Sequence, residues 1–254
     1  RDIKNEKVKA LEIGYSFRSS KFSSNINAYY TQWENKPSNG GVTVVVDDTP
    51  YRANINGMNA LHQGVEMDFS YKILDNLIVE GLLSLGDWRW YSADTVRFLD
   101  DDNNPILDDG GTEIIATFDA EGVHVGDAAQ SQFGLSLRYE PSHNSYIKIR
   151  NTYFDNYYSD FDPLSLNGVN AGRESWKIPA YNLIDLHAGI KLKIFNQKKI
   201  DIKLSVLNLL DEMYISDAQN NDPYNTSYQD FDAKSAGVFF GMGRRFSIST
   251  KFIF

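Results

Sequence analysis

The sequence predicts an all-β fold, a transmembrane antiparallel up-and-down β-barrel to which this chain contributes about nine strands. Three observations carry this prediction. Long stretches alternate apolar and polar residues with a period of two, as half-buried strands do. The connections between these stretches are short and long in turn. The chain also ends in an alternating strand whose last residue is aromatic, which is typical of barrels that close at a membrane interface.

Four predicted hairpins and one single strand share this alternation. Most of these strands are close to the roughly 9 to 11 residues that cross a bilayer with tilt. In chain order they are Ala10–Arg18 with Phe22–Trp33, Leu61–Ile73 with Leu77–Trp90, Ala129–Tyr139 with Tyr146–Tyr157, Tyr181–Phe195 with Ile200–Tyr214, and finally Gly237–Phe254.

The long polar connections all fall at one end of the predicted sheet, opposite the C-terminus. They are Glu34–Met58, Tyr91 to about Val125, Ser159–Lys177 and about Ile215 to Ser235. Outer-membrane barrels have short periplasmic turns and long extracellular loops. We therefore expect a Gram-negative outer-membrane location with the C-terminus on the periplasmic side. The membrane insertion signal of the final strand would be its apolar face, formed by Phe246, Ile248, Phe252 and Phe254.

The composition and the absence of certain motifs exclude or disfavour several other classes of protein. No run approaches the roughly 18 to 20 apolar residues of a transmembrane helix. The chain has no cysteine, which excludes a disulfide framework and a Cys-ligated metal, and its net charge of -9 argues against a nucleic-acid partner. We find no nucleophile elbow, Ser-His-Asp grouping or phosphate loop, so no catalytic residue, cofactor or enzymatic activity is predicted.

The start of the sequence and the strand count lead to one further expectation. Residues 1–9 lack the apolar segment of a signal peptide. Bacterial single-chain barrels have an even number of strands, and an open sheet in lipid would leave backbone groups unpaired. We therefore expect residues 1–254 to be part of a barrel that other strands complete.

Four motifs then resemble a known family. Gly64-Val65-Glu66, Asn151-Thr152-Tyr153, the run Ile178–Asp185 and the run Val206–Asp211 look like the C-terminal half of a TonB-dependent receptor. Trp176–Asp185 and Asp211–Ala218 resemble its Bacteroidota branch. The resemblance implies that residues 1–254 are the C-terminal part of a 22-stranded plugged barrel. An N-terminal plug and a TonB box would then belong to the rest of the receptor.

The resemblance also implies a function and a set of partners. The function is energised uptake of a scarce nutrient, such as a siderophore, cobalamin, a glycan or a peptide. The partners are outer-membrane lipid, the N-terminal part of the same receptor, TonB through that part, the barrel-assembly machinery and a surface lipoprotein. Three alternatives stay open: a passive or structural barrel, a soluble β-rich binding module, and, more weakly, an outer-membrane hydrolase.

Candidate binding residues lie in the long connections. Tyr157, Tyr158 and Trp176 are expected near the outer rim, where aromatic rings could stack on a ligand or belong to the membrane-interface girdle. Asp100, Asp102 and Asp108 could offer oxygen ligands to a hard cation. Their spacing is not that of an EF-hand loop, which favours a solvated acidic loop over a metal site.

The inward-facing positions of the predicted strands carry charged residues of both signs. His187 is expected to face the lumen in a structural role. Four inward carboxylates would form ion pairs with four inward cations across the lumen wall, which needs no catalysis. The carboxylates are Glu66, Asp68, Asp185 and Asp201, and the cations are Lys72, Arg138, Lys191 and Lys203.

Overall fold

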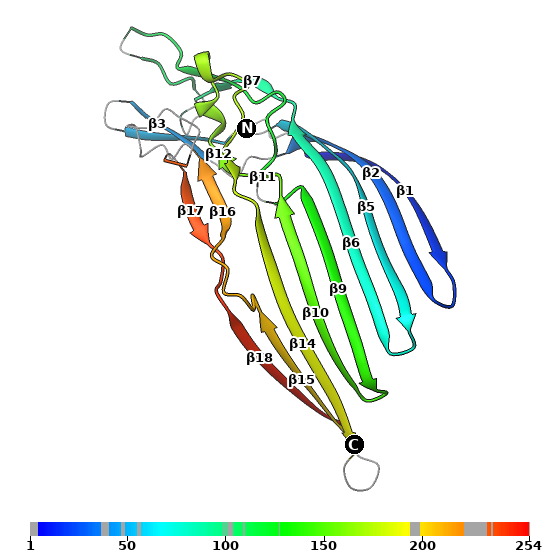
Figure 1. Ribbon diagram of the computed structural model, residues 1–254. Coiled ribbons are helices and arrows are strands. Elements are labelled where there is room, and N and C mark those ends of the chain that lie inside the picture. The colour runs from blue at the N-terminus through cyan, green and yellow to red at the C-terminus, as the bar shows by residue number, and fades with distance from the viewer. Residues whose placement is uncertain are drawn as a thin grey trace.

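The computed structural model describes residues 5–36, 41–46, 49–54, 57–98, 100, 104–108, 110–126, 128–193, 199–220, 233–234 and 236–253. Within these residues a 9-stranded antiparallel sheet runs in chain order, each strand beside the next (Figure 1). Its strands are β1 (Lys7–Arg18), β2 (Phe22–Lys36), β5 (Met58–Leu74), β6 (Leu77–Trp90), β9 (Ser131–Ser142), β10 (Ser145–Asp155), β14 (Tyr181–Lys193), β15 (Lys199–Leu207) and β18 (Arg245–Ile253). The predicted all-β, up-and-down architecture is confirmed.

The two ends of this sheet differ. The described turns of the hairpins β1–β2, β5–β6 and β9–β10 lie at the same end as the C-terminus, which we call the turn end (Figure 1). The long connections gather at the opposite end, which we call the loop end. The predicted sorting of short and long connections is therefore present. Of the fourth predicted turn, Asn196–Lys199, residues 196–198 lie outside the described residues, and Lys199 begins β15.

The long connections hold small sheets of their own, which the sequence prediction of plain loops missed. They are β3 (Gly41–Val46) with β4 (Thr49–Asn54), β7 (Ala93–Arg97) with β8 (Ile115–Asp119), β11 (Tyr157–Tyr158) with β13 (Lys177–Ile178), and β12 (Asp160–Phe161) with β16 (Ile215–Asn220) and β17 (Gly237–Phe240). Two 3-10 turns, η1 (Pro163–Ser165) and η2 (Gly168–Asn170), lie between β12 and β13. In the described part of the chain, no helix is long and apolar enough to cross a membrane.

The last predicted strand is in fact two strands. Residues 241–244 separate β17 from β18, and β17 leaves the main sheet to pair with β16. A Cβ atom on Gly241 would lie 2.0 Å from the Tyr214 ring, so only glycine lets the chain pass beneath that ring. The strand predicted to reach Tyr214 ends at Leu207, because Asn208 and Asp211 turn the chain with φ angles of 51° and 59°.

The third hairpin also needs a correction. Its second strand was predicted to run to Tyr157 but ends at Asp155. Asn156 adopts a φ of 52°, which lies outside the extended region, and the chain then starts the separate strand β11. Because of this break, Tyr157 belongs to the loop end and not to the main sheet.

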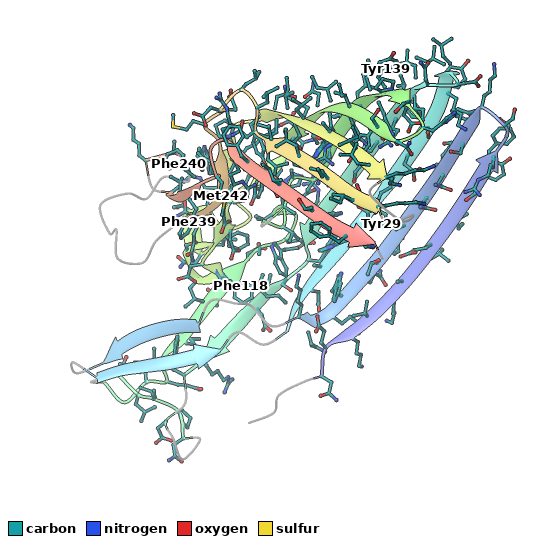
Figure 2. The ribbon with its side chains drawn as sticks, turned by 90° about the horizontal axis from the view of Figure 1, so that it is seen from below. Tyr29, Phe118, Tyr139, Phe239, Phe240 and Met242 are labelled. Atoms are coloured by element: carbon teal, nitrogen blue, oxygen red, sulfur yellow. The ribbon has the colours of Figure 1, made fainter. Side chains whose placement is uncertain are left out.

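The main sheet has an apolar face and a polar face. The cross-strand register places Leu204 opposite Ile248 and Ile149 opposite Leu186 on the apolar face. It places Lys148 opposite His187 on the polar face. The sheet bends into an arc with Tyr139 on its convex side and Tyr29 on its concave side (Figure 2). The apolar outer face and polar inner face are those of a membrane barrel wall.

The packed core lies at the loop end. Buried apolar side chains from the long connections cover the ends of β5 and β6 there. This cluster contains Met58, Ala60, Trp90, Phe98, Ile106, Phe118, Ala120, Val123, Val125, Phe161 and Leu166. A second cluster joins Ala129, Tyr157, Ile178 and Ala218. By contrast, large apolar side chains on the outer face of the wall are exposed, and Ile248 is 73% exposed.

Candidate functional site

Ion pairs cross the inner face at mid-height. Lys148 on β10 donates to the Glu80 carboxylate on β6, and Ser136 Oγ on the intervening β9 donates to Glu80 Oε2 at 3.0 Å. These bonds bind three neighbouring strands together through their polar faces. A charge-assisted hydrogen bond of this kind is stronger than a neutral one.

A second pair lies on the adjoining strands. Arg150 Nη2 donates to Asp185 Oδ2 at 2.7 Å, and the backbone N–H of Asn208 donates to Asp185 Oδ1 at 3.0 Å. The predicted ion pairing was partly wrong here. Asp185 pairs with Arg150 because the β10–β14 register sets these two residues directly opposite each other. The predicted pairing of Asp201 with Lys203 does occur, at 4.0 Å.

His187 lies on the inner face, as predicted, with Ser205 as its partner. Its Nδ1 lies 2.9 Å from Ser205 Oγ across the β14–β15 pair. A Ser–His pair can act as nucleophile and base only if a third group orients the base. The nearby carboxylate of Asp185 is held by Arg150 and Asn208 instead. This geometry supports a structural hydrogen bond.

Two hollows open on the inner face. One of about 290 Å³ is lined by the mid-height charged side chains Asp68, Glu80, Ser136, Lys148 and Arg150, among others. The other, of about 300 Å³, lies toward the turn end and is lined by Arg138, Glu140, His143, Tyr146, Lys191, Asp201 and Lys203, among others. Their polar and charged linings suit a charged, hydrogen-bonding partner.

The hollow toward the turn end depends on a close approach of side chain to backbone. The Tyr146 ring lies over Gly189, where a Cβ atom would come within 2.3 Å of it. The Arg138 guanidinium stacks above the same ring, 4.0 Å from its centroid, in a cation–π contact. This stack holds Arg138 flat against the wall.

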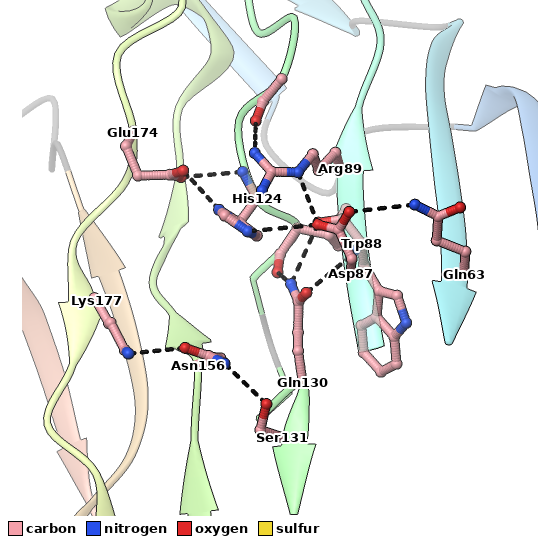
Figure 3. Close-up of polar contacts among 12 residues, drawn as sticks. Gln63, Asp87, Trp88, Arg89, His124, Gln130, Ser131, Asn156, Glu174 and Lys177 are labelled. Carbon is pink, nitrogen blue, oxygen red and sulfur yellow. Dashed lines mark hydrogen bonds and ion pairs between the residues drawn. The ribbon is translucent and has the colours of Figure 1, made fainter. Parts of the chain in front are cut away.

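A polar network ties the wall to the loop end (Figure 3). On β6, Arg89 Nε donates to Asp87 Oδ1 at 2.7 Å. His124, in the connection before β9, places Nδ1 2.6 Å from Glu174 Oε2, and its backbone N–H donates to Glu174 Oε1 at 3.0 Å. The other ring nitrogen of His124 lies 3.7 Å from Asp87 Oδ1. One histidine thus links two carboxylates that belong to different segments.

Gln130 and Lys177 extend this network. The backbone N–H of Trp88 donates to Gln130 Oε1 at 2.8 Å, and Gln130 Nε2 donates to the Val125 carbonyl at 3.0 Å. Lys177 Nζ donates to Asn156 Oδ1 at 2.8 Å and forms an ion pair with Asp155 at 2.9 Å. The hydrogen bond to Asp155 raises the pKa of Lys177 above its usual range. Sequence reasoning missed His124, Glu174 and Gln130, because no motif or period connects them.

The predicted aromatic residues lie together at the loop end in different surroundings. Tyr157 is buried, and its hydroxyl donates to the Ser216 carbonyl at 2.7 Å. Tyr158 is half-buried, and burial raises the pKa of its hydroxyl. Trp176 packs against the Tyr157 cluster. Ligand binding by these residues remains a prediction.

The carboxylates of the acidic loop stabilise turns. Asp100 accepts the Asn104 backbone N–H at 2.8 Å, and Asp108 accepts the backbone N–H groups of Gly110 and Thr112 at 2.9 and 2.8 Å. Asp102 lies outside the described residues. Among the residues that the structure does describe, no group of three or more His, Cys, Asp or Glu side chains is placed to hold a metal ion.

The predicted insertion signal lies on the outer face of the last strand. Phe246, Ile248 and Phe252 alternate there and are all exposed. Phe254 lies outside the described residues. A row of apolar side chains at this position is typical of the band of a barrel that faces lipid. Recognition of the row by the barrel-assembly machinery during insertion remains a prediction.

The fold and its two faces define a class, the transmembrane β-barrel wall. A family model described as "TonB dependent receptor-like, beta-barrel" matches residues 1–209, and the chain belongs to this family. Its members are outer-membrane transport receptors, not enzymes. No curated protein matches the chain in sequence.

Solved structures agree on the fold. The copper transporter OprC superposes with a TM-score of 0.61 at 13% identity over 98% of this chain and 31% of its own. The FrpB iron transporter from Neisseria meningitidis superposes with a TM-score of 0.58 at 17% sequence identity, over 99% of this chain and 32% of its own. The ferric yersiniabactin uptake receptor FyuA from Yersinia pestis superposes with a TM-score of 0.57 at 15% sequence identity, over 98% of this chain and 30% of its own. The chain therefore spans about a third of the length of these receptors.

Proposed function

We propose that residues 1–254 are the C-terminal wall of an outer-membrane receptor that imports a scarce nutrient with energy delivered through TonB. The observation that carries this proposal is the two-faced sheet of the receptor family, apolar outside and charged inside. The C-terminus would then lie on the periplasmic side, with the loop end outside the cell. We also propose a Bacteroidota-type receptor, on the motifs Trp176–Asp185 and Asp211–Ala218.

Each surface of the wall has its own partner in this proposal. Lipid covers the outer face, and the barrel-assembly machinery recognises the apolar row of the last strand. The N-terminal part of the same receptor fills the inner face, and TonB acts through that part. A surface lipoprotein would cover the loop end, where Tyr158 and Trp176 could contact the nutrient.

The first cargo to test is a chelated transition metal. The names of the three structural neighbours specify copper, iron and ferric yersiniabactin. Cobalamin, a glycan and a peptide are the other classes. Each would have to pass the charged inner wall beside Lys148 and Arg150.

The test is uptake by cells that carry the full gene. Radiolabelled ferric chelates, cobalamin, oligosaccharides and peptides are offered to a receptor-deletion strain and to the complemented strain, each with and without TonB. Saturable accumulation of one class that requires both the receptor and TonB supports the proposal. Accumulation that is linear in concentration and independent of TonB would instead establish a passive barrel.

A further inference from the structure

A hollow opens in the apolar outer face of the wall. It has a volume of about 310 Å³ and lies between outward-facing side chains of β6, β9, β10 and β14. This is the convex side of the sheet, on which Figure 2 shows Tyr139. The lining includes five aliphatic residues and one polar residue, which are Val79, Leu135, Leu137, Ile149, Ile184 and Asn151.

Asn151 places a carboxamide inside the apolar band. On β10 its outward-facing neighbours are Ile149 and Tyr153, and the register sets Leu135 and Ile184 beside it on β9 and β14. The residue is exposed, and within the part of the chain that the structure describes its side chain makes no hydrogen bond. A polar group in hydrocarbon without a partner is costly. A hydrogen-bonding partner that approaches from the lipid side would remove this cost.

The hollow lies below the polar rim of the outer face. Tyr153 is the next outward-facing residue toward the loop end, and its ring centroid lies 6.3 Å from that of Phe133. Beyond this pair, Asp155 forms an ion pair with Lys177 at 2.9 Å, and the Lys177 side chain is 46% exposed. Since a strand rises about 3.3 Å per residue, Asn151 lies about 7 Å below Tyr153 and about 13 Å below Asp155. Along β10, the hollow, the aromatic pair and the charged rim therefore follow the order of acyl chains, interface and headgroups in a bilayer leaflet.

We propose that this hollow binds one outer-leaflet glycolipid whose acyl chain carries a hydroxyl group, as the hydroxyacyl chains of lipopolysaccharide do. The chain lies in the hollow, and its hydroxyl group forms a hydrogen bond with the Asn151 amide. The phosphorylated sugar of the headgroup contacts the Tyr153 ring and the exposed ammonium group of Lys177. The aliphatic lining accepts any acyl chain, whereas Asn151 favours a hydroxylated one, because a plain chain leaves the amide unpaired.

Continuity with the surrounding surface identifies the occupant as a lipid. The hollow is enclosed by the apolar band that the proposed function places against the bilayer, and exposed residues such as Leu135 and Ile149 form its border. The inference rests on the proposed function only for the outer-membrane location of this face. It adds a particular class of lipid and the side chain that recognises it.

Two amphiphiles that differ by a single hydroxyl group test this inference. Hydroxymyristoyl glucosamine phosphate and myristoyl glucosamine phosphate are titrated separately onto the full-length receptor after its own lipids have been removed in detergent. Native mass spectrometry measures the bound fraction of each. We expect the hydroxylated amphiphile to bind about three- to tenfold more tightly, which corresponds to one hydrogen bond made in a membrane.

Matched variants assign this preference to one side chain. Asn151→Leu should abolish the preference, and Asn151→Ser, which keeps a hydrogen-bonding group, should retain part of it. Thr250→Val removes a hydroxyl group from the outer face of β18, outside the hollow, and should change nothing. Lys177→Gln should weaken both amphiphiles by the same factor, since their headgroups are identical. The ratio of the two affinities is independent of any fraction of receptor that fails to fold.

Three results would overturn the inference. They are equal affinities of the unaltered receptor for the two amphiphiles, an undiminished preference in Asn151→Leu, and a protein that co-purifies with the receptor and blocks both amphiphiles. Uptake by the same receptor separates the two proposals. A preference for the hydroxylated amphiphile without TonB-dependent uptake supports the lipid site and contradicts the proposed function, whereas uptake without that preference supports the function and contradicts the lipid site.

Discussion

The imidazole of His124 lies parallel to the phenol ring of Tyr158, with ring centroids 4.0 Å apart and 3° between the planes. His124 belongs to the connection before β9 and Tyr158 to β11, while Glu174 holds the imidazole from a third segment. Three stretches that are distant in sequence are thus joined at one ring. This makes the loop end a packed layer above the wall.

Replacing His124 with alanine should loosen this layer. The change removes the stack, worth roughly 0.5 to 1.5 kcal/mol, and a hydrogen bond to a charged group, worth about 1.5 to 3 kcal/mol. Hydrogen exchange should become faster around residues 120–126 and 174–178 and stay unchanged in β9 and β10. His143→Ala, in the turn of the β9–β10 hairpin, serves as the control. Unchanged exchange at residues 120–126 would mean that the ring does not hold the layer.

Asp162 should make the loop end less stable at neutral pH than at acid pH. Burial raises the pKa of Asp162, so the folded state favours its protonated form. This contribution to stability is complete below the unfolded pKa of about 3.9 and is lost as the pH rises through the folded pKa. Asp162→Asn should therefore gain stability at pH 7 and little at pH 3, measured as the midpoint of thermal unfolding in detergent.

A second variant separates charge from capping at this position. Asp162 accepts the Leu164 backbone N–H at 3.0 Å at the start of η1, and asparagine can keep this bond. Asp162→Ala cannot, and it should cost about 1 kcal/mol relative to Asp162→Asn at both pH values. Equal stability of the two variants would contradict a capping role.

The outer and inner faces of the last strand should respond differently to a new charge. Ile248→Lys places an ammonium group on the outer face and should cost roughly 2 to 4 kcal/mol near the bilayer midplane. Ser247→Lys, one residue earlier on the inner face opposite Ser205, should cost far less. Guanidinium titration of the receptor in phospholipid vesicles measures both. An equal loss of unfolding free energy in the two variants would contradict the assignment of the outer face to lipid and the inner face to water.

Gly189 should resist substitution because the Tyr146 ring occupies the space of its missing Cβ atom. Gly189→Ala would bring that atom within 2.3 Å of the ring and should cost about 1 to 3 kcal/mol through overpacking. The double variant with Tyr146→Ala should show a large non-additive coupling in a double-mutant cycle. Gly237→Ala, whose Cβ meets nothing nearer than 3.9 Å, is the matched control. Additive losses would show that the ring moves aside freely.

The strands of the wall were predictable because lipid on the outer face and water on the inner face require apolar and polar side chains in alternation along every strand. The bounds predicted for Leu77–Trp90 coincide with those of β6. The break between β17 and β18 was not predictable, since the Tyr214 ring that passes over Gly241 comes from a distant segment. The alternation of apolar and polar residues along one strand does not indicate which distant side chain will contact it.

The polar contacts were harder to predict than the strands. A slip of one residue in register changes every cross-strand partner. Asp185 therefore could not be matched to Arg150 before the β10–β14 register was known. His124 and Glu174 lie fifty positions apart in irregular segments. Because these segments have no repeating pattern, the sequence does not indicate that the two side chains lie close together. By contrast, the outward row Phe246, Ile248 and Phe252 needed only the alternation itself.

Among the described residues, the hairpin β3–β4 forms a two-stranded sheet of its own, with Gly41 opposite Asn54 and Val46 opposite Thr49. The ladder between these two strands does not use the strands of the wall. The register between β2 and β5 is set separately, along their own ladder. Residues inserted into or deleted from this hairpin therefore need not shift the strands below. This part of the loop end can therefore change in length and sequence while the strands of the wall keep their pairing.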